Sequence, residues 1–177
     1  MEHAPHPRPM RRAKREVTDP AAIRAIIDRC QVVRIAAHDD EGLFIMPLNF
    51  GYEWDLSQPE SLPTFWLHSA TEGRKVDAWR ACPDVALEMD IENGVITGDY
   101  SCAYSFAFES VMAWGRIVQV HDDAEKRHGL NLLMEHMAPG APVEFSDTAV
   151  ERIALWCVDV ERVSAKLRQA KKPHPHA

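Results

Sequence analysis

The hydrophobic residues of this chain recur with two spacings, three to four residues in some segments and two residues in others. From Ile23 to Cys30 the spacing is that of one apolar helix face, and Thr18-Asp19-Pro20 supplies a cap and a proline for the first turn. Strand-like apolar segments follow at 32–37 and 43–52, separated by turn residues at 39–42. The first part of the chain therefore predicts a helix followed by a β-hairpin.

Both patterns continue to the end of the chain. Strands are predicted at 64–69, 85–91 and 154–160, helices at 73–81, 122–137 and briefly after Ser146-Asp147, and a turn at Asn93-Gly94. The segment 100–120 is apolar on both strand faces, with Val111 on one and Met112 and Trp114 on the other. A strand apolar on both faces is buried on both, so we expect one face to fill a barrel and the other to meet a second subunit. Gly115, in the middle of this strand, indicates a bend or a close ligand.

These elements define the expected fold class. Six or seven strands joined mostly as hairpins, with about three helices and no regular βαβ alternation, predict a mainly β (α+β) protein built on an antiparallel barrel with peripheral helices. The domain is expected at 18–166, between basic flexible tails at 1–17 and 167–177.

Composition and charge narrow the possible functions. The 177 residues fit one domain, and the net charge of −7 resides in the body of the chain, because both ends are basic. An acidic body repels phosphate backbones, so no nucleic-acid partner is expected. We also expect no membrane association and a cytoplasmic location, since no long apolar run or secretory signal is visible. The four cysteines form no CxxC pair and are expected to be reduced thiols.

One corner of the predicted barrel has the chemistry of an anion site. His68 and Ser69 end a strand, and a helix then begins at Gly73 with Arg74 and Lys75 in its first turn. Cations are disfavoured at a helix N-terminus, and a bound phosphate would relieve that conflict. The alternative is that both cations simply point into water.

Other candidate residues give weaker signals. Arg34 lies inside an apolar strand and needs either an anionic ligand or an acidic partner. His128 and His136 are eight residues apart and the sequence holds no HExxH motif, so no metal site is predicted. The sequence also holds no P-loop or GxGxxG motif for nucleotide binding. No spacing identifies catalytic residues.

The residues between about Arg11 and Lys166 resemble the FMN-binding split β-barrel proteins related to pyridoxamine 5'-phosphate oxidase, most closely the nitroimidazole-resistance (Nim-type) branch. The segments that carry this resemblance, in order, are Arg15–Asp19, Val33–Ala36, Asp40–Gly42, Pro47–Tyr52, His68–Ala70, Gly73–Lys75, Cys102, Tyr104-Ser105, Ser110-Val111 with Gly115, Leu132–Met134 and His136. Two departures are Phe44, where many relatives have proline, and the long loop 53–63.

The resemblance implies a split barrel that forms a homodimer with FMN at the subunit interface. It further implies that backbone groups along Pro47–Asn49 follow the flavin ring and that a neighbouring subunit contributes to each site. The cofactor-binding residues expected on these combined grounds are Arg34, Pro47, Leu48, Asn49, His68, Ser69, Arg74, Lys75, Ser110 and Val111.

The expected function is therefore that of an FMN-dependent oxidoreductase. It would take electrons from NAD(P)H and reduce a small-molecule acceptor, with nitroaromatic compounds as candidates. One alternative is a haem-binding or haem-handling protein, with His68 or a histidine of helix 122–137 as the axial ligand. Another is a dimer that binds flavin without catalysis.

Overall fold

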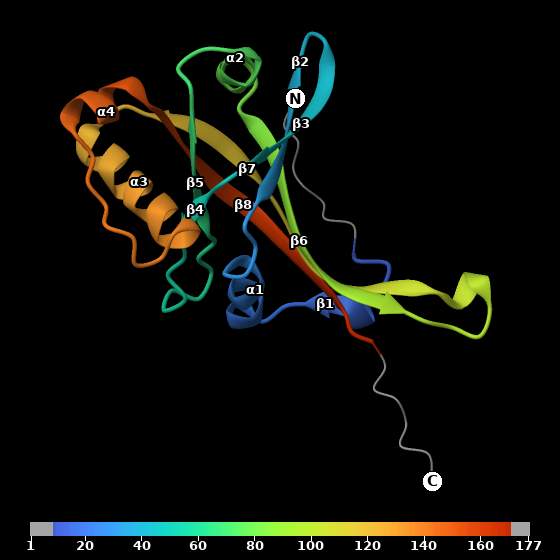
Figure 1. Cartoon of the computed structure of the whole chain (residues 1–177). Helices are drawn as coiled ribbons and strands as arrows, with labels where there is room; N and C mark the ends of the chain where they lie inside the picture. The colour runs from blue at the N-terminus through green and yellow to red at the C-terminus, as the bar shows by residue number, and fades with distance from the viewer. Residues whose placement is uncertain (1–8, 171–177) are drawn as a thin grey trace.

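The computed structural model describes residues 9–170, which form eight β-strands and four α-helices (Figure 1). The strands are β1 (Glu16–Val17), β2 (Val33–Asp39), β3 (Gly42–Leu48), β4 (Gly51–Glu53), β5 (Thr64–Ser69), β6 (Asp84–Ile96), β7 (Ser105–Val120) and β8 (Ala154–Arg168). The helices are α1 (Pro20–Ile27), α2 (Arg74–Ala81), α3 (Asp123–Met137) and α4 (Asp147–Arg152), with short 3-10 turns η1 (Ala13–Arg15) and η2 (Ser101–Ala103).

All eight strands belong to one antiparallel sheet, whose edges are formed by β3 and β4. The order is β3-β2-β6-β7-β8-β5-β4, and β1 pairs separately with β8. Yet β3 and β4 follow each other in the chain, joined only by Asn49 and Phe50. Three Cα–Cα steps of about 3.8 Å span at most about 11 Å, so the two edges must approach each other here. The sheet is thus a barrel split between β3 and β4, and we call the junction at Asn49-Phe50 the seam.

Phe50 closes the barrel interior at the seam. Its side chain is fully buried, and its ring lies 5.7 Å from the Phe65 ring and 4.3 Å from the His136 ring, measured between centroids. Most of the remaining core comes from the inward positions of the strands, including Ile35 and Leu87, and the buried faces of helices α1 and α2 complete it. The period of two in the sequence therefore selects the residues that fill the barrel.

A second hydrophobic cluster lies outside the barrel. Helices α3 and α4 cover one side of the sheet (Figure 1), where Leu130 and Leu133 of α3 pack with Trp66 of β5 and Leu155 of β8. Strand β5 is therefore buried on both faces, since Phe65 points into the main core and Trp66 into the second cluster. This double burial fixes the position of the residues that follow β5.

Gly115 produces a bend in β7. The pairing of β7 with β8 shifts by one residue between Trp114 and Gly115, as in a β-bulge. A Cβ atom at Gly115 would lie 2.1 Å from the Asp159 carbonyl oxygen, so only glycine fits. The bend predicted from the sequence is confirmed here.

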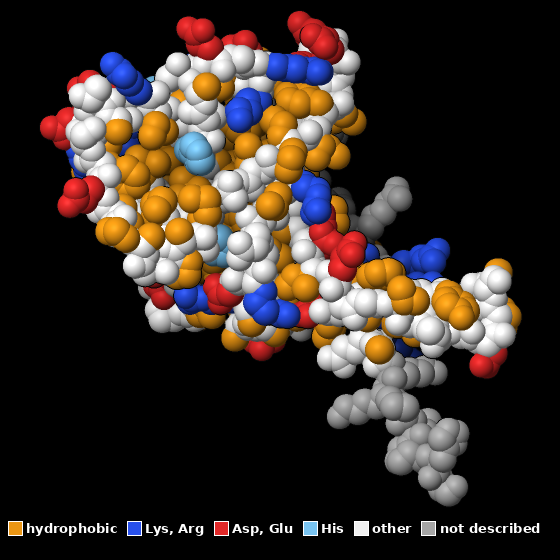
Figure 2. Space-filling model, in the orientation of Figure 1, with side chains coloured by type: hydrophobic (Ala, Val, Ile, Leu, Met, Phe, Trp, Pro, Cys, Tyr) orange, Lys and Arg blue, Asp and Glu red, His pale blue; other side chains and the backbone are white. Residues whose placement is uncertain are grey.

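The ends of β6 and β7 form an arm that leaves the barrel, drawn at the lower right of Figure 1. The predicted turn at Asn93-Gly94 is wrong, because β6 continues through a register shift between Glu92 and Val95 and the chain reverses only near η2. The guanidinium of Arg29, in the turn after α1, holds the root of the arm through two bonds to the Glu109 carboxylate, at 3.0 and 2.5 Å. Figure 2 shows hydrophobic side chains gathered on the arm, where the exposed residues are Val95, Tyr100, Tyr104 and Phe106.

Several local predictions are confirmed, whereas some boundaries differ. Asp19 caps α1 by accepting a bond from the Ala21 N–H at 3.2 Å, and β5 has the predicted limits. The predicted strand 43–52 is broken at the seam into β3 and β4. The strand count rises to eight because of this break and the short β1, and the short helix predicted after Ser146 is present as α4.

The predicted tails are partly ordered. Residues 13–17 form η1 and β1, and β8 extends to Arg168, so part of each predicted tail belongs to secondary structure. The parts of the tails at 1–8 and 171–177 lie outside the described residues. Among the described helices, none combines the length and the apolar character needed to cross a bilayer.

We predict that Phe50→Ala destabilises the fold by about 3–5 kcal/mol, because it removes a fully buried aromatic ring at the seam. Urea unfolding followed by tryptophan fluorescence measures the loss. The control is Leu43→Ala, since Leu43 is 82% exposed and should change stability by less than about 0.5 kcal/mol. A loss below about 1 kcal/mol for Phe50→Ala would contradict the role given to the seam.

Candidate functional site

A cavity of about 320 Å³ opens at the seam, and we call it the seam cavity. The end of β3 forms one wall, and the turn from β5 to α2 forms the other. If the β4–β5 register, in which Gly51 opposes Trp66, is continued backwards, Asn49 lies level with His68. This explains why residues about 20 positions apart line one space. The lining residues are Val32, Pro47, Leu48, Asn49, His68, Ser69, Ala70 and Lys75.

Ser69 is held in place by its own hydrogen bonds. Its side chain is buried, and its hydroxyl donates to the Ala70 carbonyl oxygen at 2.6 Å and accepts from the Trp156 indole N–H at 2.9 Å. A serine hydroxyl has a single proton to donate, and here that proton is already engaged. Ser69 therefore fixes the turn and leaves one lone pair for a further donor.

His68 faces the seam cavity on the side of β5 opposite to Ser69. Partial burial lowers the pKa of the His68 imidazole below its ordinary value of 6.5, and the nearby Lys75 ammonium lowers that pKa further. The imidazole is therefore neutral at pH 7, with one nitrogen as a donor and the other as an acceptor. Lys75 supplies the positive charge of this cavity.

The turn before α2 places Lys75 beside His68. Gly73 caps the helix with φ at +118°, a conformation that favours glycine. Its carbonyl oxygen accepts bonds from the Val76 and Asp77 N–H groups at 2.8 and 3.1 Å. The N–H groups of Arg74 and Lys75 precede these first helical bonds, so helix geometry leaves them available to an anion.

Arg74 does not line the seam cavity. Its guanidinium makes two bonds to the Asp39 carboxylate, at 2.6 and 3.0 Å, and lies 4.3 Å above the Phe44 ring. Glu41 lies 3.5 Å from the same guanidinium. The bond from Arg74 lowers the pKa of the Asp39 carboxyl, so the pair is charged at neutral pH. The structure thus separates two cations that are adjacent in sequence, because the β2–β3 turn presents an acid to one of them.

Three further predicted residues lie away from the seam cavity within one chain. Arg34 binds Glu88 at 3.0 Å and Asp90 at 2.7 Å, the acidic alternative left open by the sequence. Ser110 lies opposite Asp90 on the neighbouring strand. Val111 is fully buried in the core of its own chain, so its side chain is directed away from any second subunit.

Sequence reasoning missed two lining residues, Val32 and Ala70. The sequence pattern places Val32 in a strand, but β2 begins one residue later and leaves the Val32 side chain 37% exposed at the cavity. Its outward position depends on where the strand begins, which apolar patterning does not determine. Ala70 follows Ser69 directly and has no distinctive chemistry of its own.

A larger cavity of about 750 Å³ lies between α1, α3 and the loop after β4. Two of its polar side chains are already engaged: the Tyr52 hydroxyl donates to the Asp28 carboxylate, and the His136 ring nitrogen Nε2 lies 2.8 Å from the Cys30 carbonyl oxygen. Within residues 9–170, no group of three His, Cys, Asp or Glu side chains is arranged to hold a metal ion. The seam cavity, whose Lys75 ammonium forms no ion pair with any residue between 9 and 170, is therefore the better candidate site.

Comparisons with known proteins agree on the fold. A family profile described as pyridoxamine 5'-phosphate oxidase matches residues 19–167. A candidate 5-nitroimidazole antibiotic resistance protein from Bacteroides thetaiotaomicron has a similar structure, with a TM-score of 0.73, 29% identity and 85% of each chain covered.

Two more distant structures share the fold alone. The flavocytochrome Anf3 from Azotobacter vinelandii has a TM-score of 0.76 at 20% identity, over 95% of this chain and 79% of that chain. An FAD and heme binding protein from Mycobacterium smegmatis has a TM-score of 0.77 at 18% identity, over 88% of this chain and 74% of that chain. No curated protein sequence matches this chain.

Proposed function

Because this chain belongs to the pyridoxamine 5'-phosphate oxidase family, we propose that it is a flavoprotein that binds FMN in the seam cavity. The observation that carries the proposal is the shared cavity of Lys75, His68 and the end of β3. A cation at one end and an apolar strand at the other fit a molecule with a phosphate group and a ring system.

Lys75 and the start of α2 form the phosphate end of the proposed site. The Lys75 ammonium lines the cavity, and the first N–H groups of the helix lie next to it in the chain. Anions are favoured at such a position by the helix dipole and by the free N–H groups. A neutral His68 adds one donor or acceptor without repelling a phosphate.

The ring end of the proposed site lies along Pro47, Leu48 and Asn49. The exposed Val32 side chain extends this wall as an apolar surface. The volume of about 320 Å³ is small for a complete cofactor site, since such sites usually measure about 300–1,000 Å³. A second copy of the chain over the open side would enlarge and close it.

The proposed reaction is reduction of a small-molecule acceptor with electrons from NAD(P)H. A bound flavin supplies the electron and hydride transfer, and the protein holds the ring and excludes water. The resemblance of this chain to a candidate nitroimidazole resistance protein supports a nitroaromatic acceptor.

Haem binding is a second candidate function, favoured by one observation. His68 presents a neutral imidazole at an open cavity, and neutral imidazole is the form that binds haem iron. Two proteins of the same fold are named as a flavocytochrome and as an FAD and heme binding protein. A Soret band that appears on haem addition and is lost in His68→Ala would favour this function.

The proposed assembly is a homodimer formed through the outer face of the sheet. Ile45 of β3, Ala36 of β2, Ala86 of β6 and Trp114 of β7 lie in one row across four strands of that face. Ile45 is 68% exposed in the single chain. Water contact with such a row is unfavourable, and a second copy packed on it would remove the contact.

The same face reaches the seam cavity. Pro47 follows Ile45 on the outer side of β3 and also lines the cavity. Arg34 and Ser110, both predicted to contact the cofactor, lie on this face as well but do not line the cavity. Arg34 lies opposite Pro47, and Ser110 lies opposite Asp90 on β6. A dimer built here would bring Ser110 of one subunit toward the other, whereas Val111 faces its own core.

We predict that Lys75→Gln weakens FMN binding about tenfold or more and leaves riboflavin binding unchanged. Riboflavin has the same ring but no phosphate, and a charge-assisted hydrogen bond contributes about 1.5–3 kcal/mol. Fluorescence titration of both ligands measures the two affinities. The matched control is Arg74→Gln, which removes the cation that Asp39 already neutralises and should change FMN affinity less than about threefold. Equal losses for FMN and riboflavin would contradict the phosphate role of Lys75.

We predict that NADPH, added without oxygen to the FMN-loaded protein, bleaches the visible flavin absorbance. A nitroaromatic compound added next should restore that absorbance as it is reduced. A flavin that stays oxidised with both NADPH and NADH would contradict the reductase and favour a non-catalytic flavin-binding dimer.

We predict that Ile45→Asp converts a dimer into a monomer, because it places a charge in the apolar row. Ile45 is mostly exposed, so the substitution should leave each subunit folded. Light scattering after gel filtration gives the mass, and Val143→Asp, an exposed position between α3 and α4, is the control. A wild-type monomer at micromolar concentration, or an Ile45→Asp dimer, would contradict this interface.

A further inference from the structure

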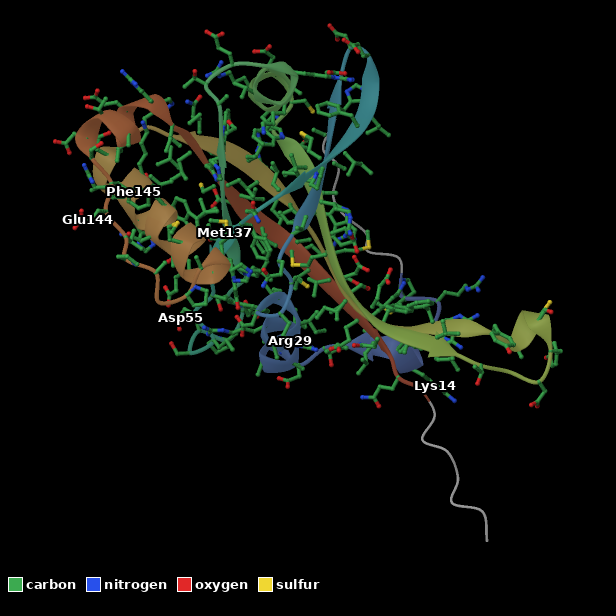
Figure 3. All side chains as sticks on the ribbon, viewed as in Figure 1. Lys14, Arg29, Asp55, Met137, Glu144 and Phe145 are labelled. Atoms are coloured by element: carbon green, nitrogen blue, oxygen red, sulfur yellow. The ribbon has the colours of Figure 1, made fainter. Side chains whose placement is uncertain are left out.

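Positively charged side chains gather around a second, smaller cavity far from the seam. Strand β1 pairs with the end of β8, with Glu16 opposite Lys166, and this pairing brings the basic segment before β1 next to β8. The resulting cavity of about 280 Å³ is lined by Arg11, Arg12, Arg15, Phe108 and Lys166, and we call it the basic pocket. Lys14, labelled in Figure 3, marks this segment near the end of β8, on the opposite side of the molecule from α3.

The two cavities lie at opposite ends of β8. Ser69 of the seam cavity pairs with Ala154, the first residue of β8, whereas Lys166 is near its last residue. At about 3.3 Å per residue, the strand separates these positions by about 40 Å. The basic pocket is therefore separate from the seam cavity of the same chain, and the Lys75→Gln variant below tests whether it is also separate from the seam cavity of a second copy.

The cations of the basic pocket have no acidic partner in the described part of the chain. Arg29, Arg34 and Arg74 each form ion pairs within 4.0 Å, but no such pair joins a lining residue of the basic pocket to an Asp or Glu among residues 9–170. Glu16 is the neighbouring acid, and it forms none of the observed ion pairs. The described part of the chain thus concentrates positive charge here without an acidic side chain to pair with it.

Crowding of like charges makes this arrangement unfavourable by itself. Partial burial lowers the pKa of the Arg15 guanidinium, and the nearby Arg12 and Arg168 lower it further. The backbone nevertheless fixes the position of the group, since the Arg15 N–H donates to the Arg12 carbonyl oxygen at 2.8 Å within η1. Arg168 donates to the hydroxyl of Ser105, the first residue of β7. An anion would relieve the repulsion and use a geometry that is already in place.

We propose that the basic pocket binds a small soluble molecule that carries a phosphate group with two or more negative charges. The planar guanidinium groups of Arg11, Arg12 and Arg15 match phosphate oxygens in pairs. The half-buried Phe108 forms an apolar wall that a flat membrane surface or a bare ion would not need. A long polyanion is disfavoured, because the remainder of the chain is acidic.

Inorganic pyrophosphate is the probe for this site. Calorimetric titration of the full chain at 150 mM salt, a concentration that screens weak surface attraction, should give saturable binding of one pyrophosphate per chain. The double variant Arg15→Gln with Lys166→Gln should bind pyrophosphate at least about tenfold more weakly. Lys75→Gln should bind it as the wild type does, which separates this pocket from the seam cavity.

Two further variants keep the test decisive. The control Arg80→Gln with Lys126→Gln also removes two positive charges, but outside the basic pocket, so it should bind pyrophosphate with full affinity. In the structure Arg80 donates to Gln119 and Lys126 donates to the Val150 carbonyl oxygen. Arg11→Gln with Arg12→Gln changes exposed residues before β1, so it tests the pocket if the first double variant fails to fold. Circular dichroism checks the fold of each variant.

Three results would overturn the proposal. One is the absence of binding at 150 mM salt, and another is an equal loss in the control variant, which would indicate general charge attraction. The third is binding to anionic phospholipid vesicles, lost in Arg15→Gln with Lys166→Gln, together with no binding of pyrophosphate. That result would identify the cluster as a membrane contact.

Discussion

The two-residue connection between β3 and β4 is the constraint on which the remainder of the structure depends. Asn49 and Phe50 carry the chain from one edge of the sheet to the other, so the sheet must curl until its edges meet. Burial of Phe50 holds that closure, because the ring fills the barrel where no strand pairing exists. The edges cannot pair fully at this point, and the resulting opening is the seam cavity, so the same connection completes the core and creates the candidate site.

Charge is distributed so that each end of the barrel offers a different cationic surface. At the seam, Asp39 neutralises Arg74 and leaves Lys75 beside a His68 that is neutral at pH 7. One ammonium with helix N–H groups suits a single phosphate next to an apolar wall. At the far end of β8, several arginines meet without an acidic partner among the described residues, which suits a more highly charged ligand. The acidic surface between them repels long polyanions from both.

Local signals in the sequence predicted much of this arrangement. The Asp19 cap, the limits of β5 and the bend at Gly115 each depend on residues that act within a few positions of themselves. Six of the ten expected cofactor residues line one cavity. His68, Ser69 and Lys75 follow from the strand that ends at Ser69 and the helix that begins after Gly73, whereas Pro47–Asn49 were expected only from the family resemblance. Pairings between distant segments were not readable from the sequence. Asp39 lies 35 positions from Arg74, so their ion pair could not be predicted. The segment 43–52 has the apolar pattern of one continuous strand, although the structure breaks it at the seam.

The central claim is that the seam cavity holds a flavin through its phosphate. The most direct measurement is the visible absorbance spectrum of the purified protein, recorded before and after addition of FMN and removal of the unbound excess. The account predicts the two-band spectrum of an oxidised flavin at one FMN per chain, and loss of that spectrum from Lys75→Gln after the same wash. A protein that remains colourless after incubation with FMN would contradict it.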